Sequence, residues 1–277
     1  MLEYRTAVNL SPCTRDALTV MLTRYRTRRK TRYRVIDVHV QATLTLAYLA
    51  GAGTYRQLAY GNGLDKTTLW RAIQEGITVL ARRALPLTEV IRLAAAARWD
   101  YLILDGTCVP TNRIMAALPA NRRYYCGKHK RHSVNVQTLA APDGTLLWAS
   151  GALPGATVDI TAARHFHIMD KIEQAGQHTG HHLGVLTDLG YRGLKDAIVG
   201  YKRCRNRRTL TTGQRAVNHL ITTTRCIGER ANAQLKAHKI LTHHLRCHPQ
   251  RITAHIKATL AVHYLQTNPL PTTPTTP

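Results

Sequence analysis

The sequence predicts a mixed α/β domain that follows an all-helical region. Apolar residues recur every four positions from Ile36 to Tyr48, a spacing that predicts a helix, and Gly51 is expected to end it. Farther along, short apolar runs typical of strands alternate with segments of helical spacing, which favours an α/β fold. The apolar runs cover 101–104, 134–139, 145–152 and 184–187, and the helical spacing covers 160–172 and 214–246.

We divide the chain into three segments on this basis. Residues 1–95 are the helical region, residues 96–246 are the α/β domain, and residues 247–277 are a C-terminal helix and a tail. The tail from Pro269 is rich in proline and threonine, a composition that predicts disorder.

The charge of the chain indicates a polyanion as its partner. Lysine and arginine number 39 and aspartate and glutamate 15, which gives a formal net charge of +24 over 277 residues. An excess of this size favours nucleic acid, and a membrane surface is disfavoured because the basic residues are spread over the whole chain. No apolar stretch approaches the roughly 18 residues of a membrane-spanning helix, and Met1 to Ser11 lack the layout of a secretory signal. We therefore expect a cytoplasmic protein close to DNA.

The cysteines predict neither a disulfide framework nor a zinc ribbon. None of the six forms a CxxC pair, so reduced and mostly buried thiols are expected. One cluster near the C-terminus has metal-ligand residue types but no second ligand pair at finger spacing, which favours a solvated or phosphate-facing helix end over structural zinc. The cluster consists of His243, His244, Cys247 and His248.

A basic segment and a helix–turn–helix pattern lie in the first 95 residues. Arg24 to Arg34 holds seven basic residues in eleven positions, typical of a phosphate-contacting arm or of a solvated turn. A short helix over Thr54 to Tyr60, a turn at Gly61–Gly63 and an N-cap at Asp65 predict two helices joined by a tight turn.

The second of these helices has one apolar face, through Leu69, Ile73, Ile77 and Leu80. A recognition helix contacts DNA through its exposed side near the N-terminus. An ordinary helical hairpin has the same sequence pattern. The positive charge of the chain favours the DNA-binding interpretation. The expected DNA contacts there are Lys66, Thr67, Thr68 and Arg71.

Acidic residues are scarce, and three of them stand out. Glu229 is the only carboxylate from Ala197 to the C-terminus, and an ion pair with a neighbouring arginine is its simplest explanation. Asp105 and Asp188 each follow an apolar run and precede a glycine, so both are expected where a strand ends and the chain turns. A fourth acid, Asp159, precedes a helical stretch and is expected to be its N-cap rather than part of a site.

The segments around these three acids resemble a known family. Leu104–Thr107, Leu186–Tyr191 and Arg225–Glu229 with Lys236 beyond it are similar to the three catalytic blocks of bacterial insertion-sequence transposases in the DDE endonuclease superfamily, which includes Harbinger-like elements. Asn218, the segment 151–159 and the helical N-terminus match as well. The chain departs from the family pattern at Thr222, where many relatives have a tyrosine, and the 188–229 interval is too short for an inserted domain.

The resemblance implies a ribonuclease H-like catalytic domain in which Asp105, Asp188 and Glu229 hold two Mg²⁺ or Mn²⁺ ions. It implies cleavage of transposon ends and strand transfer into target DNA by an oligomer, with a dimer as the simplest form, near the bacterial nucleoid. Two-metal chemistry of this kind needs carboxylate ligands on rigid elements. The substrate would be double-stranded DNA, with the terminal inverted repeats of the element as its specific sites.

Further DNA contacts are expected from the charge pattern of the α/β domain. On a helix, Arg225 and Lys236 share one face with Glu229, so phosphate contacts and a metal ligand would address the same DNA strand. Backbone contacts are also expected from Lys128, Lys130 and Arg131. Two alternatives remain open: a transposase-derived DNA-binding protein without nuclease activity, and a structure-specific nuclease of the same fold.

Overall fold

The computed structural model describes residues 11–30, 34–112, 118–203, 209–242, 245 and 247–269. Contacts divide the chain into two compact units. The helical unit comprises Met1–Ala84 and Leu235–Asn268, and the sheet unit comprises Leu85–Gln234 and Pro269–Pro277. The three-segment division expected from the sequence stays a prediction.

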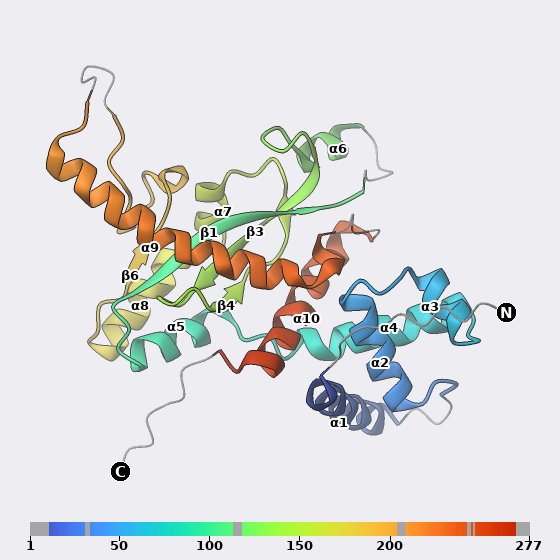
Figure 1. The fold of residues 1–277 in the computed structure, drawn as a ribbon. Helices are drawn as coiled ribbons and strands as arrows, with labels where there is room; N and C mark the ends of the chain where they lie inside the picture. The colour runs from blue at the N-terminus through green and yellow to red at the C-terminus, as the bar shows by residue number, and fades with distance from the viewer. Residues whose placement is uncertain are drawn as a thin grey trace, which may run out of the picture. The chain divides into compact units, whose positions relative to one another are not determined.

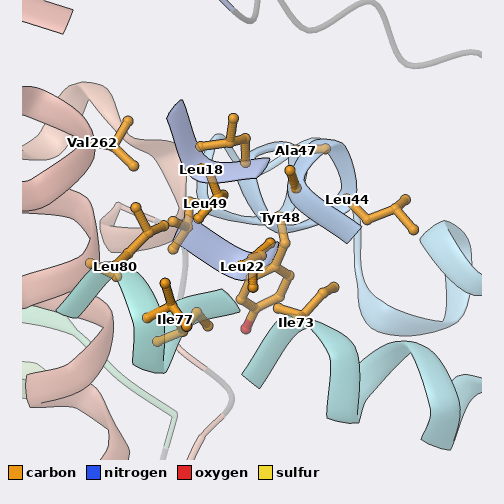
Figure 2. Close-up of a cluster of buried hydrophobic side chains, with 14 of the residues drawn as sticks. Leu18, Leu22, Leu44, Ala47, Tyr48, Leu49, Ile73, Ile77, Leu80 and Val262 are labelled. Atoms are coloured by element: carbon orange, nitrogen blue, oxygen red, sulfur yellow. The ribbon is translucent and has the colours of Figure 1, made fainter. Parts of the chain in front are cut away.

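The helical unit takes helices from both ends of the chain (Figure 1). Its elements are α1 (Pro12–Arg29), α2 (Val38–Leu49), α3 (Tyr55–Gly61), α4 (Lys66–Ala81), the 3₁₀ turn η2 (Lys239–Leu241) and α10 (Pro249–Thr267). Figure 2 shows the core between α1, α2, α4 and α10, which is formed by Leu18, Leu22, Tyr48, Leu49, Ile73, Ile77, Leu80 and Val262 among others.

The predicted helix–turn–helix elements are confirmed. Thr54 caps α3 through a reciprocal capping box with Gln57, and the Asp65 carboxylate accepts hydrogen bonds from the backbone amides of Thr67 (2.7 Å) and Thr68 (3.1 Å) at the start of α4. The helix predicted to end near Gly51 is α2, and Gly51 follows it with a positive φ of 77°.

The basic residues from Arg24 to Arg34 lie in different surroundings. Most of its first half lies on α1, where Arg26 is partly buried and donates to the carbonyl of Ile36 (3.0 Å). Arg34 forms a two-bonded ion pair with Glu75 on α4, at 2.6 and 3.0 Å. These two arginines therefore make contacts within the unit, and a phosphate contact from the segment stays a prediction. Arg32 lies outside the described residues.

The sheet unit is built on a mixed sheet. Its strands are β1 (Tyr101–Pro110), β2 (Tyr125–Cys126), β3 (Arg131–Ala140), β4 (Leu146–Ala149), β5 (Leu153–Pro154) and β6 (Gly184–Leu186). β3 is antiparallel to β1 on one side and to β2, β4 and β5 on the other, whereas β6 runs parallel to β1. A single parallel bridge from Leu186 to Ile198 extends the sheet beyond β6.

Helices cover both faces of this sheet. They are α5 (Leu87–Ala96), α6 (Leu118–Tyr124), α7 (Asp159–His165), α8 (Ile168–Thr179), the 3₁₀ turn η1 (Leu189–Tyr191) and α9 (Thr212–Ala237). Leu102 and Leu104 point from β1 into a core with α5, α7 and α8. Ile103 points the other way, and α9 crosses the sheet on that side with Gly228 packed directly on Ile103 (Figure 1).

The antiparallel β1–β3–β4 ladder with a parallel β6 on the far side of β1 is the strand arrangement of a ribonuclease H-like domain. The predicted fold class, a mixed α/β domain with an N-terminal helical region, is confirmed. Two helices differ from the prediction: the helix predicted over 160–172 breaks at His167, which has a φ of 53°, and the helix predicted over 214–246 ends at Ala237. Within the described residues, no helix has the length and apolar character to span a membrane.

Candidate active site

Asp105 lies in the middle of β1 and faces α9. We expected it at the end of a strand, but β1 continues to Pro110 because Gly106–Pro110 pair with β3. The Oδ1 atom of Asp105 accepts from the backbone amide of Gly106 (2.9 Å), and Oδ2 accepts from the side-chain amide of Asn232 on α9 (2.9 Å). Asn232 in turn accepts a bond from Thr138 of β3 (2.8 Å), so strand and helix hold the carboxylate from two sides.

Asp188 stands beside Asp105 because β1 and β6 are parallel. Ile103 pairs with Leu186, and each aspartate comes two residues after its member of this pair. As predicted, Asp188 follows the end of its strand, where its Oδ1 accepts from the amide of Gly190 (2.8 Å) and begins η1. The parallel register therefore places the two carboxylates at the same level of the sheet.

The electrostatics of Asp105 favour the binding of a cation. The pKa of this carboxyl is raised to about 6, mainly by burial and in smaller part by the charges of Asp188 and Asp159, against the lowering effects of the Gly106 amide and of Arg225. Carboxylates that raise one another's pKa are neutralised when a divalent cation binds between them, and hard cations prefer such oxygen ligands. The residues present thus fit a Mg²⁺ or Mn²⁺ site.

Glu229 lies on α9 at the part of the helix that crosses β1. It directly follows Gly228, which packs on Ile103, and it precedes Asn232, which binds Asp105. Its side chain is exposed, and within the described parts of the chain it makes no hydrogen bond or ion pair; Arg230 instead donates to the carbonyl of Asp143 (3.1 Å). The structure therefore gives no support to the simple explanation that Glu229 serves as an ion-pair partner.

A cavity of about 220 Å³ joins the Asp188 loop to α9. Arg225 forms part of its wall and is close enough to lower the pKa of Asp105. Thr222, which stands where many relatives have a tyrosine, lines the same cavity. The full set of lining residues is Thr187, Asp188, Leu189, Gly200, Asn218, Ile221, Thr222 and Arg225.

Asp159 is the acid that sequence reasoning misplaced. It is the first residue of α7 rather than its N-cap, which is Val158. Its carboxylate occupies the space that a side chain at Gly106 would fill and accepts bonds from Asn135 (2.7 Å) and Gln137 (3.3 Å). Because Gly106 and Asp105 face opposite sides of β1, Asp159 supports the strand from behind Asp105.

The comparison with protein families agrees with this geometry. A family model described as DDE superfamily endonuclease matches residues 104–264, more than half of the chain. The chain belongs to this family. Neither a search of curated proteins nor one of solved structures gave a match. The matched span of this DDE endonuclease contains Asp105, Asp188 and Glu229, and membership implies a nuclease with a DNA substrate and, as is general in the family, divalent metal ions.

The expected DNA contacts of the endonuclease lie at exposed or half-buried positions. On α4, Lys66, Thr67 and Arg71 are exposed and Thr68 is half-buried. In the sheet unit, Lys128, Lys130 and Arg131 are exposed on the β2–β3 hairpin and Arg225 is half-buried on α9. Lys236, near the end of α9 and within the helical unit, is half-buried as well. Their role in DNA binding stays a prediction.

A basic surface of the helical unit joins three arginines of the predicted phosphate-contacting segment to two that sequence reasoning missed. A cavity of about 500 Å³ in the helical unit is lined by arginines of α1 and of the end of α4, and Arg29 and Arg82 each stack on Tyr25, at 5.6 and 5.5 Å from its ring centre. We call it the arginine pocket; its basic members are Arg24, Arg28, Arg29, Arg82 and Arg83. Arg82 and Arg83 lie about fifty positions from the others in sequence, so only the packing of α1 on α4 reveals the group.

The C-terminal histidine and cysteine cluster is only partly described. His243 and His244 lie outside the described residues. The ring of His248 accepts from the amide of Gln250 (3.4 Å) as the N-cap of α10, and burial raises the pKa of the Cys247 thiol to about 11. His248 thus has a capping role, and metal binding by the cluster stays untested.

Proposed function

We propose that this DDE endonuclease is a DNA transposase that cuts the ends of its element and joins them to target DNA. The observation that carries the proposal is the parallel β1–β6 register, which sets Asp105 beside Asp188 where α9 crosses with Glu229. In support, Glu229 is exposed and has no ion-pair partner among the described residues. Asp105, Asp188 and Glu229 are the proposed ligands of two Mg²⁺ or Mn²⁺ ions.

The chain's own residues would position the DNA strand. Arg225 lines the cavity next to Asp188 and offers a guanidinium to the scissile phosphate, while Asn232 keeps the Asp105 carboxylate turned toward α9. When bound, the two ions would supply an activated hydroxyl at neutral pH and would neutralise charge on the phosphate oxygens. The freed 3′ hydroxyl of the element would then attack a phosphodiester of the target in the same site, which conserves the bond energy and requires no nucleotide.

The test uses the DNA that borders the gene on both sides, as labelled duplexes, with the full-length protein. We expect nicks at the ends of inverted repeats with Mg²⁺ or Mn²⁺, no nicks with EDTA, and joined products when a plasmid target is added. Asp105→Asn, Asp188→Asn and Glu229→Gln should each abolish cutting. Asp170→Asn is the matched control, because Asp170 is an exposed acid of α8 whose ion pair is with His167 (3.0 Å).

Each other outcome assigns a different function. Cutting that survives Glu229→Gln removes Glu229 from the site. Cutting of unrelated DNA without joining identifies a structure-specific nuclease. Binding of DNA with no metal uptake in calorimetry identifies a DNA-binding protein without nuclease activity, and sedimentation of the DNA complex tests the expected dimer.

A further inference from the structure

Two cysteines that are far apart in the sequence meet on the sheet. Cys108 of β1 and Cys126 of β2 have their Sγ atoms 4.0 Å apart. Their strands flank β3, where Cys108 pairs with Asn135 and Cys126 pairs with Arg131. Asn135 and Arg131 are four residues apart on β3, so their side chains project to the same face of the sheet. The thiols that the sequence left scattered are therefore neighbours.

An imidazole completes the group. His129 follows Cys126 by three positions in the turn 127–130, where Lys130 has a φ of 48° as the chain enters β3. The two Sγ atoms and a ring nitrogen of His129 all lie within 4.8 Å of one another. Cys126 is buried, Cys108 half-buried and His129 exposed, so the group is fixed on the strand side and open on the turn side.

We propose that Cys108, Cys126 and His129 bind Zn²⁺. Two thiolates on a tetrahedral zinc ion with Zn–S bonds of about 2.3 Å lie about 3.8 Å apart, and the observed 4.0 Å requires almost no movement. Three protein ligands leave a fourth position for water, on the exposed side of His129. Thiolate and imidazole ligands select zinc over magnesium, so this site differs in chemistry from the carboxylates around Asp105.

A disulfide fits the same pair less well. An S–S bond of about 2.05 Å would require the two sulfurs to approach by roughly half their separation. Burial, and then the neighbouring Cys126, raise the pKa of the Cys108 thiol, which keeps it protonated and slow to oxidise at neutral pH. Zinc must displace this proton, so its affinity should rise with pH.

The zinc site would fasten the β2–β3 turn to the strand that carries Asp105. Cys126 and His129 belong to the hairpin with Lys128, Lys130 and Arg131, whereas Cys108 is three residues after Asp105 on β1. If the proposed function is right, the bound ion holds these basic side chains in place for DNA. Zinc binding itself does not depend on that function.

The experiment uses Co²⁺ as the probe for zinc, with full-length protein kept reduced. We expect thiolate-to-cobalt absorption that corresponds to one thiolate-bound Co²⁺ per chain and is displaced by Zn²⁺; Co²⁺ on carboxylates does not contribute to this absorption. Cys108→Ser and Cys126→Ser should abolish the absorption. His129→Ala should weaken Co²⁺ binding by at least roughly tenfold, because loss of a residue that only supports a metal ligand already weakens binding by about that factor. Cys13→Ser, an exposed thiol of α1, should change nothing.

Three results would overturn the site. The first is the absence of thiolate-to-cobalt absorption in the unaltered protein, and the second is an unchanged spectrum in Cys108→Ser. The third is an intact mass showing that Cys108 and Cys126 form a disulfide that resists the reductant. Circular dichroism of each variant shows whether it folds, and Cys108→Ala replaces the serine variant if that one does not. Asp105→Asn separates the two proposals, because it should abolish cutting while the cobalt spectrum remains.

Discussion

The side-chain amide of Asn232 donates a 2.9 Å hydrogen bond to Oδ2 of Asp105 and so connects α9 to the centre of β1. The bond orients one carboxylate oxygen from the same helix that carries Glu229. It links the stability of the sheet unit to the geometry of the candidate site.

Replacing this amide should affect both stability and metal binding. Asn232→Ala leaves a half-buried carboxylate without its donor, and loss of a bond to a charged group costs roughly 1.5–3 kcal/mol. Urea unfolding measures this cost. Gln234→Ala is the control, since Gln234 is on the same helix and accepts from the amide of Leu146 (2.7 Å) away from Asp105. Equal Mg²⁺ affinities in the two variants would show that Asn232 has only a structural role.

Gly106 should tolerate no side chain. The Asp159 carboxylate fills the space next to it, so Gly106→Ala must displace this carboxylate from its hydrogen bonds to Asn135 and Gln137. We expect a loss of about 1–3 kcal/mol, typical of overpacking, together with loss of cutting. Gly213→Ala is the contrast: it lies near the start of α9 with open space around it, and alanine there should be neutral or stabilising. A fully stable Gly106→Ala variant would contradict the packing described here.

The raised pKa of Asp105 predicts a pH-dependent stability. The folded carboxyl has a pKa of about 6 against an ordinary 3.8, so between these values the folded state binds more protons than the unfolded state. Stability therefore falls as pH rises from about 4 to 6, by on the order of 2–3 kcal/mol in the absence of metal. The difference between unaltered protein and Asp105→Asn, measured by urea unfolding at pH 4.5 and 7.5, isolates this effect. A constant difference would mean that Asp105 titrates normally.

The arginine pocket should bind the phosphates of DNA. Arg82→Ala and Arg83→Ala should weaken binding to all sequences alike, and each should make the dependence of log affinity on log salt shallower by about one. Fluorescence anisotropy over a salt series measures both effects. Arg15→Ala serves as control, because Arg15 is an exposed arginine of α1 that pairs with Asp16 (3.0 Å). Slopes that match this control would exclude the pocket from the DNA interface.

The sequence predicted the parts of this fold that depend on local pattern. The capped helices around Thr54 and Asp65, the strand that ends before Asp188 and the ribonuclease H-like class all follow from spacing, turn residues or motif resemblance. Asp105 was placed at a strand end because Gly106–Cys108 break the apolar run, yet these residues pair with β3 and continue the strand.

Long-range partners could not be predicted in this way. Arg34 meets Glu75 across 41 positions, and Asn232 meets Asp105 across 127. Nothing near Asp159 in the sequence signals that its carboxylate replaces the missing side chain of Gly106. Cys108 and Cys126 likewise come together only when their strands, β1 and β2, both pair with β3.

The participation of α10 in the helical unit has a consequence for biosynthesis. Ala258, Ala261 and Val262 complete the core between α1, α2 and α4, and the ribosome makes them only after Leu85–Gln234 of the sheet unit. Until then Ile77 and Leu80 lack their cover, so the nascent N-terminal helices need either a chaperone or delayed docking. A stop codon before Pro249 would leave a product with exposed apolar side chains, which would aggregate rather than form a compact DNA-binding fragment.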